Sequence, residues 1–341
     1  MASEPDDDVR LSETVRRLDV WARTLAELDY DGAFALVLES LRLDPVTAWQ
    51  EIVRNHSSRF MNSMLYAQKI PVMADVLDGL YADHPDMICM TAQHGAENLR
   101  RAKESRAANI DKGLPPLLMI AQGKSGSVSF GNIVPSGFGL TCTTYSMMTL
   151  KVIPSWARDF ARGGACYVTH LRPYPYSNIE ALVAAGLNRA VVQTRDPRQI
   201  YLSLLHHIDC YRSDFPQKLK SNYYALPMAE RAVVDMDFYE GIIAWIGGYV
   251  EAEKRDMEIL FTTFECILDD RQQVVDDIID FYGADRALFN AEAAFRTSNS
   301  VDYHFRRGAK EEWRTAFVPA MQRALNERIP PEWFGKFGWN P

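Results

Sequence analysis

Residues 121–130, with the sequence Ala-Gln-Gly-Lys-Ser-Gly-Ser-Val-Ser-Phe, have the composition of a phosphate-binding loop. They follow an apolar run at 115–120 and precede a stretch that can form a helix, which predicts a strand, a tight glycine loop and a helix start. Backbone N–H groups in such a loop and the positive end of a helix attract an anion, and Lys124 adds a full positive charge. The ATP-binding motif Gly-x-x-x-x-Gly-Lys-[Ser/Thr] does not fit, because its first glycine would fall on Leu118.

A second candidate anion ligand, Arg195, follows a buried strand predicted at 189–194. Asp196 is a good N-cap and Pro197 suits the first position of the helix that follows, in which apolar residues recur at one-turn spacing. Arg195 is therefore expected at the carboxyl end of a strand, where ligands bind in open α/β sheets. Its guanidinium could hold phosphate oxygens or pair with a nearby carboxylate.

Two further segments carry polar residues in suggestive positions. His170 ends a strand predicted at 165–170, where its imidazole could accept a proton or serve a structural role. Near the C-terminus, Arg306-Arg307-Gly308 precedes Trp313, and a basic pair before glycine is either a solvated turn or part of an anion site.

In this order, the four segments resemble the sulfotransferases that use 3′-phosphoadenosine-5′-phosphosulfate (PAPS), of the cytosolic type. The Lys-Ser-Gly-Ser sequence at 124–127 resembles the 5′-phosphosulfate loop of that family. Arg195-Asp-Pro, with Ser203 eight residues after the arginine, resembles its 3′-phosphate signature. The segment 306–308 is similar to its Arg-Lys-Gly loop, and Thr169-His170-Leu171 to the stretch that carries its catalytic base.

The resemblance implies a reaction, a co-substrate and a role for each residue. A sulfuryl group would pass from PAPS to a hydroxyl or amine of a small-molecule or carbohydrate acceptor by in-line displacement, without a metal. Lys124 would stabilise the leaving 5′-phosphate and His170 would act as the general base. The implied ligands of the 5′-phosphosulfate are Lys124 and the backbone N–H groups of Ser125, Gly126, Ser127 and Val128, and those of the 3′-phosphate are Arg195, Ser203, Arg306, Arg307 and Gly308.

The chain departs from the family pattern near the predicted base and after the last strand. Val168 stands where the family often has a lysine, and Arg172 is inserted between Leu171 and Pro173. In the segment 259–265, Phe264 replaces the usual tyrosine, so the hydrogen bond of that hydroxyl is absent.

Composition and charge limit the classes of partner. The 341 residues are 47% hydrophobic and 24% charged, which is typical of a globular protein, and the formal net charge of −8 does not favour a nucleic acid or an anionic membrane. No apolar segment suggests a leader or a membrane span, so we expect a cytoplasmic protein. Five scattered cysteines and seven histidines without metal-site spacing predict no disulfide framework and no metal.

The order of the predicted elements indicates two domains. Residues 12–110 show helical periodicity, and Gly113 with Pro115-Pro116 ends this part, which places a helical extension at 1–112 and a sulfotransferase domain at 113–341. In the second part, strands predicted at 116–122, 165–170, 189–194 and 258–263 alternate with helices, including one at 265–282. That alternation predicts a three-layer α/β fold with a parallel sheet and helices on both faces.

Several alternatives stay open at this point. A P-loop nucleotide kinase fits the Gly-Lys-Ser triplet, although it would need the missing glycine and an acidic magnesium ligand. A non-catalytic scaffold would bind nucleotide without turnover. The helical extension must bury its apolar stripes against the second domain, a partner or a second copy of the chain.

Overall fold

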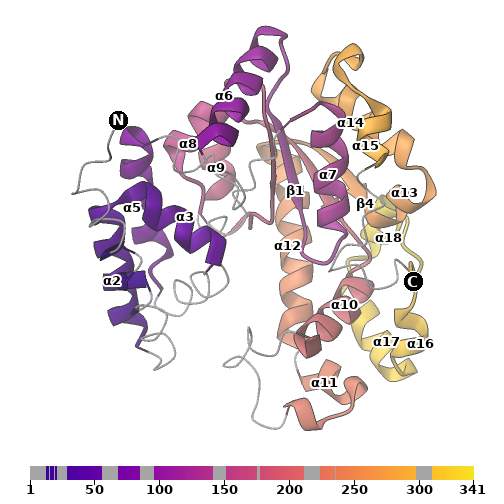
Figure 1. The fold of residues 1–341 in the computed structure, drawn as a ribbon. Coiled ribbons are helices and arrows are strands. Elements are labelled where there is room, and N and C mark those ends of the chain that lie inside the picture. The colour runs from indigo at the N-terminus through magenta and orange to yellow at the C-terminus, as the bar shows by residue number, and fades with distance from the viewer. Residues whose placement is uncertain are drawn as a thin grey trace, which may run out of the picture. The chain divides into compact units, whose positions relative to one another are not determined.

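The protein is described here by a computed structural model, which covers residues 13–14, 16–18, 20, 29–55, 68–84, 96–140, 151–174, 177–210, 223–234, 236–296 and 309–341. The chain divides into two compact units, the first formed by Met1–Leu118 and Leu140–Asn188, the second by Met119–Gly139 and Arg189–Pro341 (Figure 1). The boundary at residue 112 stays a prediction. Among the described helices, none combines the length and apolar character needed to cross a bilayer.

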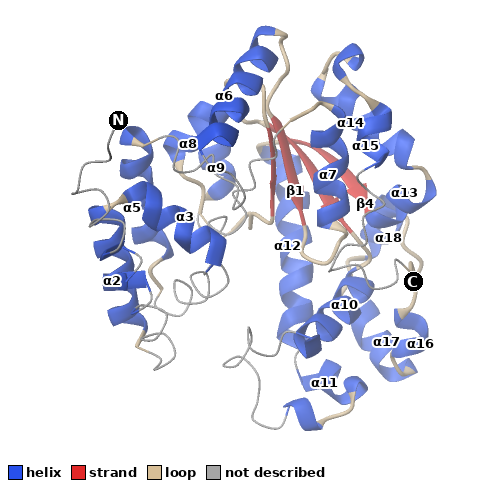
Figure 2. Cartoon of the chain, in the orientation of Figure 1, coloured by secondary structure: helices blue, strands red, loops and turns tan. Residues whose placement is uncertain are grey.

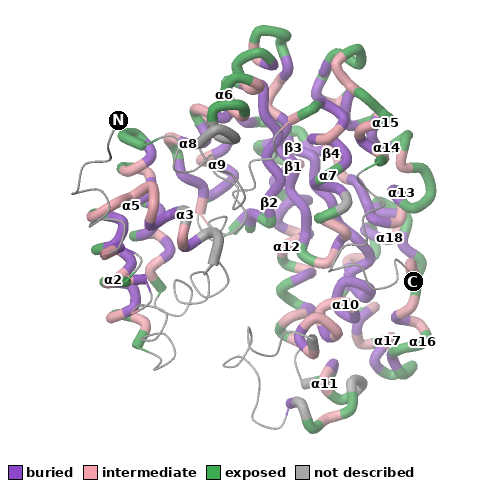
Figure 3. Tube along the Cα trace, in the orientation of Figure 1, coloured by how far each residue is buried: buried purple, intermediate pink, exposed green. Residues whose placement is uncertain are grey.

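A four-stranded sheet forms the centre of the fold, as predicted (Figure 2). The strands β1 (Leu117–Ala121), β2 (Cys166–Thr169), β3 (Arg189–Thr194) and β4 (Glu258–Thr263) lie in the order β2-β1-β3-β4. The pairs β1–β3 and β3–β4 are parallel, with Met119 opposite Val191 and Thr194 opposite Thr263. All five residues of β1 are buried, as is usual for a parallel strand that is covered on both faces (Figure 3).

The second unit contains the end of β1, the strands β3 and β4, and the helices that cover them. Figure 1 shows α7 on one face of these strands and α12 on the other, which gives the predicted three layers. The helices of this unit are α7 (Ser127–Gly137), α10 (Pro197–Cys210), α11 (Met228–Val234), α12 (Met236–Arg255), α13 (Phe264–Asp269), α14 (Arg271–Tyr282), α15 (Ala291–Arg296), α16 (Trp313–Ala316), α17 (Pro319–Asn326) and α18 (Pro331–Phe337), with short 3₁₀ turns η3 (Tyr223–Ala225) and η4 (Arg286–Leu288).

One helix boundary in this unit differs from the prediction. The helix predicted over 265–282 is two helices, α13 and α14, that meet at Asp270. The Asp270 side chain accepts a hydrogen bond from the Gln273 N–H, so it ends one helix and caps the next.

The first unit joins β2 to α2 (Tyr30–Leu43), α3 (Pro45–Asn55), α5 (Ile70–Asp83), α6 (Ala96–Asp111), α8 (Pro154–Phe160) and α9 (Asn178–Ala184). Helices α5 and α6, from the predicted extension, bond directly to α8. The Asp78 carboxylate accepts from the Ser155 N–H at 2.7 Å and so caps the start of α8. Asp159 at its other end accepts from the Tyr81 hydroxyl at 3.0 Å and pairs with Arg106 at 2.6 Å. Part of the extension is therefore integrated with residues 154–160.

Candidate active site

The loop after β1 has the backbone shape of an anion cradle. Lys124 and Gly126 both have positive φ, 67° and 79°. When left-handed residues alternate with right-handed ones, successive backbone N–H groups point toward the same place and can bind an anion. Gly126 is also the residue before α7, and no side chain caps that helix start. The first backbone bond of α7 runs from Phe130 N to Gly126 O at 3.1 Å, so the three preceding N–H groups have no acceptor within the helix. A non-glycine residue held at positive φ, such as Lys124, is typical of a functional loop.

Buried amide and hydroxyl groups hold this loop against β3. Ser125 is fully buried, and both its N–H and its hydroxyl donate to Gln122 O, at 3.1 and 2.6 Å. Gln193 Nε2 donates to Ser125 O at 3.1 Å, and Gln193 Oε1 accepts from the Thr262 hydroxyl at 2.5 Å. The Ser125 N–H and hydroxyl thus stabilise the turn in this structure, while Lys124 is only partly buried.

The register of β3 and β4 brings Phe264 into contact with both the loop and Arg195. Thr194 lies opposite Thr263, so the next residues, Arg195 and Phe264, leave their strands side by side. The Arg195 guanidinium carbon lies 4.2 Å from the centre of the Phe264 ring. The same ring lies so close to Gly126 that a Cβ there would come within 2.4 Å of it. Only glycine satisfies both this contact and the positive φ, so the Phe264 ring touches the loop at Gly126 and the guanidinium of Arg195, a three-residue contact that we call the stack.

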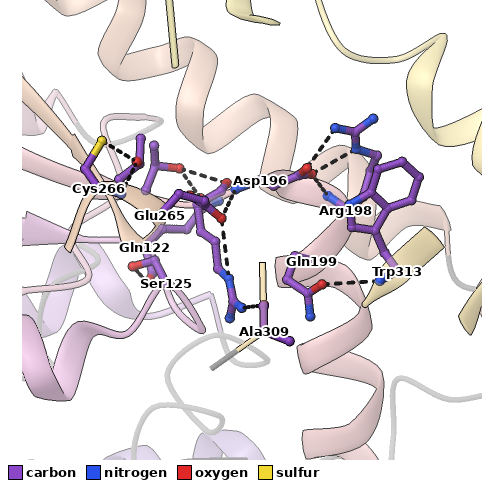
Figure 4. A network of polar contacts seen from close by, with 12 residues as sticks. Gln122, Ser125, Asp196, Arg198, Gln199, Glu265, Cys266, Ala309 and Trp313 are labelled. Atoms are coloured by element: carbon purple, nitrogen blue, oxygen red, sulfur yellow. Dashed lines mark hydrogen bonds and ion pairs between the residues drawn. The ribbon is translucent and has the colours of Figure 1, made fainter. Parts of the chain in front are cut away.

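Arg195 is almost completely buried and has two further contacts. Its Nη2 donates to Ala309 O, and its Nε lies 3.8 Å from Glu265 Oε1 (Figure 4). Ala309 is the first described residue after the predicted basic segment 306–308. The arginine at the end of β3 is therefore connected to the chain that follows that segment.

The neighbouring Asp196 caps α10 as the sequence predicted, and it also pairs with a buried arginine that sequence reasoning did not identify. Its Oδ1 accepts from the Arg198 N–H and Nε, both at 2.9 Å, and its Oδ2 accepts from Arg198 Nη2 at 2.7 Å (Figure 4). Arg198 has no exposed surface, and its guanidinium carbon lies 3.9 Å from the Trp313 ring centre. It also donates to Asn326 Oδ1 at 2.6 Å and Asn340 O at 2.5 Å, which fixes the C-terminal helices to α10.

Glu265 is a buried carboxyl group beside Arg195. Its Oε1 accepts from the Asp196 N–H at 3.4 Å, whereas its Oε2 is buried and has no hydrogen-bond partner within the described part of the chain. Burial raises the pKa of the Glu265 carboxyl, and the charge of Asp196 adds to the rise, while the positive charge of Arg195 opposes it. This carboxyl therefore releases its proton less readily than an ordinary glutamic acid.

The remaining candidate residues lie in different parts of the structure. Ser203 lies on α10, two turns after Asp196, and is partly buried. Trp313 donates its backbone N–H to Gln199 Oε1 on that helix, at 3.3 Å. Arg306, Arg307 and Gly308 lie outside the described residues. Ser127 and Val128 form the first turn of α7, with the Val128 side chain exposed.

His170 directly follows β2, as predicted, and its side chain is exposed. It belongs to the first unit, whereas Lys124 and Arg195 belong to the second. Around it, Leu171 N donates to the Thr169 hydroxyl at 3.1 Å, and Arg172 O accepts from the Asn178 side chain at 2.7 Å. The chain after β2 is therefore held by buried polar groups that leave the imidazole at the surface.

Four residues of this region were missed or given no role by sequence reasoning: Gln122, Gln193, Arg198 and Glu265. A signal existed for the two glutamines, because each lies at the carboxyl end of a run of buried apolar residues, where an amide must find a partner. Glu265 carries no such signal, because its neighbours depend on strand register. For Arg198, the sequence does not show that Asn326 and Asn340, more than 100 residues away, bury it together with Asp196.

Comparison with known proteins identifies a family. The family model described as "Sulfotransferase domain" matches residues 165–338, which include His170, Arg195 and Ser203 but not the loop at 122–126. Solved structures similar to the chain include mouse sulfotransferase SULT7A1 complexed with PAP, 16% identical with a TM-score of 0.46, covering 66% of this chain and 87% of that one. Another is retinol dehydratase in complex with androsterone and inactive cofactor PAP, 16% identical with a TM-score of 0.40, covering 67% and 84%. Among curated proteins, no sequence match was found.

Proposed function

The chain belongs to the sulfotransferase family, and we propose that it transfers a sulfuryl group from PAPS to a hydroxyl or amine of a small-molecule or carbohydrate acceptor. The stack of Gly126, Phe264 and Arg195 carries this proposal. It connects a loop shaped for one phosphate to a buried arginine suited to a second, as adenosine 3′,5′-bisphosphate (PAP) requires. PAP is the product that PAPS leaves after transfer, and the solved structures named above were obtained with it.

The residues of the second unit fit such a nucleotide. Lys124 and the N–H groups at the start of α7 would hold the 5′-phosphosulfate and stabilise the negative charge that gathers on the departing phosphate. Arg195, with Ser203 and the segment Arg306-Arg307-Gly308, would hold the 3′-phosphate, which ordinary ATP lacks.

His170 is proposed as the general base. It follows β2, the neighbour of β1 in the sheet, and ligands bind at the carboxyl ends of strands in open α/β sheets. As the acceptor oxygen or nitrogen forms its bond to sulfur, the bond from sulfur to the 5′-phosphate oxygen breaks, and the acceptor's proton passes to the imidazole. The mechanism as proposed uses no metal.

Turnover separates this function from nucleotide binding without catalysis. We would incubate the protein with PAPS and a panel of phenols, sterols, amines and sugars, and detect PAP together with a sulfated acceptor by mass spectrometry. His170→Ala should lower turnover by about 10² to 10⁴ and leave PAP binding unchanged. His84→Ala, at an exposed histidine just after α5, is the matched control and should keep full activity. A wild-type protein that binds PAP but sulfates none of the panel would favour a non-catalytic nucleotide-binding protein.

A further inference from the structure

The register of β3 and β4 places Glu265 next to Arg195. Continuing the β3–β4 pairing beyond Thr194 and Thr263 sets Arg195 beside Phe264 and Asp196 beside Glu265. The contacts agree, since the arginine stacks on Phe264 and the Asp196 N–H donates to Glu265 Oε1 at 3.4 Å. Glu265 also lies in the first turn of α13, whose start is fixed by Thr263 accepting from the Cys266 N–H. Its carboxyl group is thus anchored from both strands.

Among the described residues, two carboxyl groups lie beside Arg195, those of Asp196 and Glu265, and of these two Glu265 is the one free to direct the guanidinium. Both oxygens of Asp196 already accept from Arg198, in three contacts of 2.7 to 2.9 Å. Glu265 Oε1 lies 3.8 Å from Arg195 Nε, a single contact without the fork geometry that joins Asp196 to Arg198. A contact at Nε restricts the rotation of the guanidinium. It does not form the pair of parallel hydrogen bonds that two phosphate oxygens would form with this group.

Retaining this carboxyl group is unfavourable for folding. Burial raises the pKa of the Glu265 carboxyl because it disfavours the charged form, and Oε2 is buried without a hydrogen-bond partner among the described residues. A buried carboxyl group with a perturbed pKa beside the proposed phosphate ligand Arg195 is a candidate for a functional role.

We infer that Glu265 is a positioning residue that holds the Arg195 guanidinium against the Phe264 ring, so that Arg195 meets the 3′-phosphate of the nucleotide in one orientation. This rests on the proposed function, because it assigns the 3′-phosphate to Arg195. Glu265 itself does not touch the nucleotide. Its effect is on selectivity for nucleotides that carry a 3′-phosphate over those that do not.

The test compares the binding of PAP and AMP, which lacks the 3′-phosphate, by isothermal titration calorimetry. Glu265→Ala should weaken PAP about tenfold or more, the loss expected when a charge-assisted phosphate contact is misdirected, and change AMP less than about twofold. Glu265→Gln should weaken PAP less than Glu265→Ala does, because the amide oxygen can still accept from the Asp196 N–H but no longer carries the charge that pairs with Arg195. Glu258→Gln is the matched control, since Glu258 pairs with Arg189 at 2.7 Å across the opposite ends of the same two strands. It should leave both affinities unchanged.

The remaining outcomes would overturn either the positioning role of Glu265 or the proposed function. If Glu265→Ala binds PAP as tightly as wild type or more tightly, or weakens PAP and AMP equally, the positioning role is wrong. If Glu265→Ala does not fold, Glu265→Asp replaces it, because the shorter side chain keeps the charge but withdraws it from Nε, and the same loss of PAP selectivity is expected. A wild-type protein that shows no preference for PAP over AMP would instead overturn the proposed function.

Discussion

Two buried arginines near the start of α10, three residues apart, are held by their neighbours in different ways. Arg198 is bound bidentately by Asp196, donates to Asn326 and Asn340, and stacks on Trp313. Arg195 stacks on Phe264 next to the glycine loop, and its contact with Glu265 is a single one at 3.8 Å. The first arrangement holds the C-terminal helices, and the second suits an arginine that must meet a ligand. The difference lies in the geometry of the partners and not in burial, which is nearly complete for both.

The largest effect should come from removing Arg198. Arg198→Ala leaves Asp196 buried without its counter-ion, and we expect the free energy of unfolding to fall by about 3–5 kcal/mol. Urea unfolding monitored by circular dichroism measures this. Arg189→Ala, at an exposed ion pair, should change it by less than about 1 kcal/mol. Equal small losses for both variants would mean that Arg198 does not hold the fold.

Removing Arg195 should weaken nucleotide binding more than it lowers the stability of the fold. Arg195→Ala should weaken PAP binding by about 1.5–3 kcal/mol, the contribution of a hydrogen bond to a charged group. Stability should change less than in Arg198→Ala, because the pKa of Glu265 is already raised and this carboxyl can take up a proton when its partner is lost. Calorimetric titration and urea unfolding of the same sample give both values, and a variant that unfolds as readily as Arg198→Ala would remove the distinction between the two arginines.

A third test targets the loop side of the stack. In Gly126→Ala, the new Cβ would meet the Phe264 ring at 2.4 Å and the residue would stay at positive φ, which together destabilise the loop by about 1–2 kcal/mol or more. We expect weaker PAP binding in titration calorimetry, because Phe264 must move and Arg195 packs on it. Gly123→Ala in the same loop is the control, since nothing lies within 4 Å of a Cβ there. Unchanged PAP binding in Gly126→Ala would mean that the contact between the loop and Phe264 does not affect how Arg195 binds the nucleotide.

The elements of the second unit were largely predictable from the sequence, and the family match confirms the predicted sulfotransferase. Short apolar runs between turn signals gave β3 and β4, and likewise β1 and the first unit's β2, within two residues, because a buried parallel strand needs apolar residues on both faces. The N-cap role of Asp196 followed equally from local chemistry. The burial of Arg198 could not be recognised, because Trp313, Asn326 and Asn340 come from segments distant in the sequence. Glu265 could not be recognised because its neighbours depend on the register of β3 and β4. The assigned roles of Lys124, His170 and Ser203 stay predictions.

The smallest expected effect concerns pH. The pKa of Glu265 is raised in the folded state, so the folded protein keeps this proton when the unfolded chain has released it. Glu265 therefore lowers stability as pH rises from the ordinary glutamate pKa through its folded value. The stability of Glu265→Gln relative to wild type should be greater at neutral pH than at about pH 4, in paired thermal melts. A difference that stays constant with pH, or that shrinks as pH rises, would contradict the direction of this shift.

The thermal shift of the wild-type protein with PAP and with AMP tests most directly whether this site recognises a 3′-phosphate. At a PAP concentration about 100 times its dissociation constant, binding to the folded state alone should add about 2.7 kcal/mol of stability and raise the melting temperature. AMP at the same concentration should produce little change, because Arg195 and its neighbours would find no 3′-phosphate. Equal shifts with PAP and AMP would contradict the account.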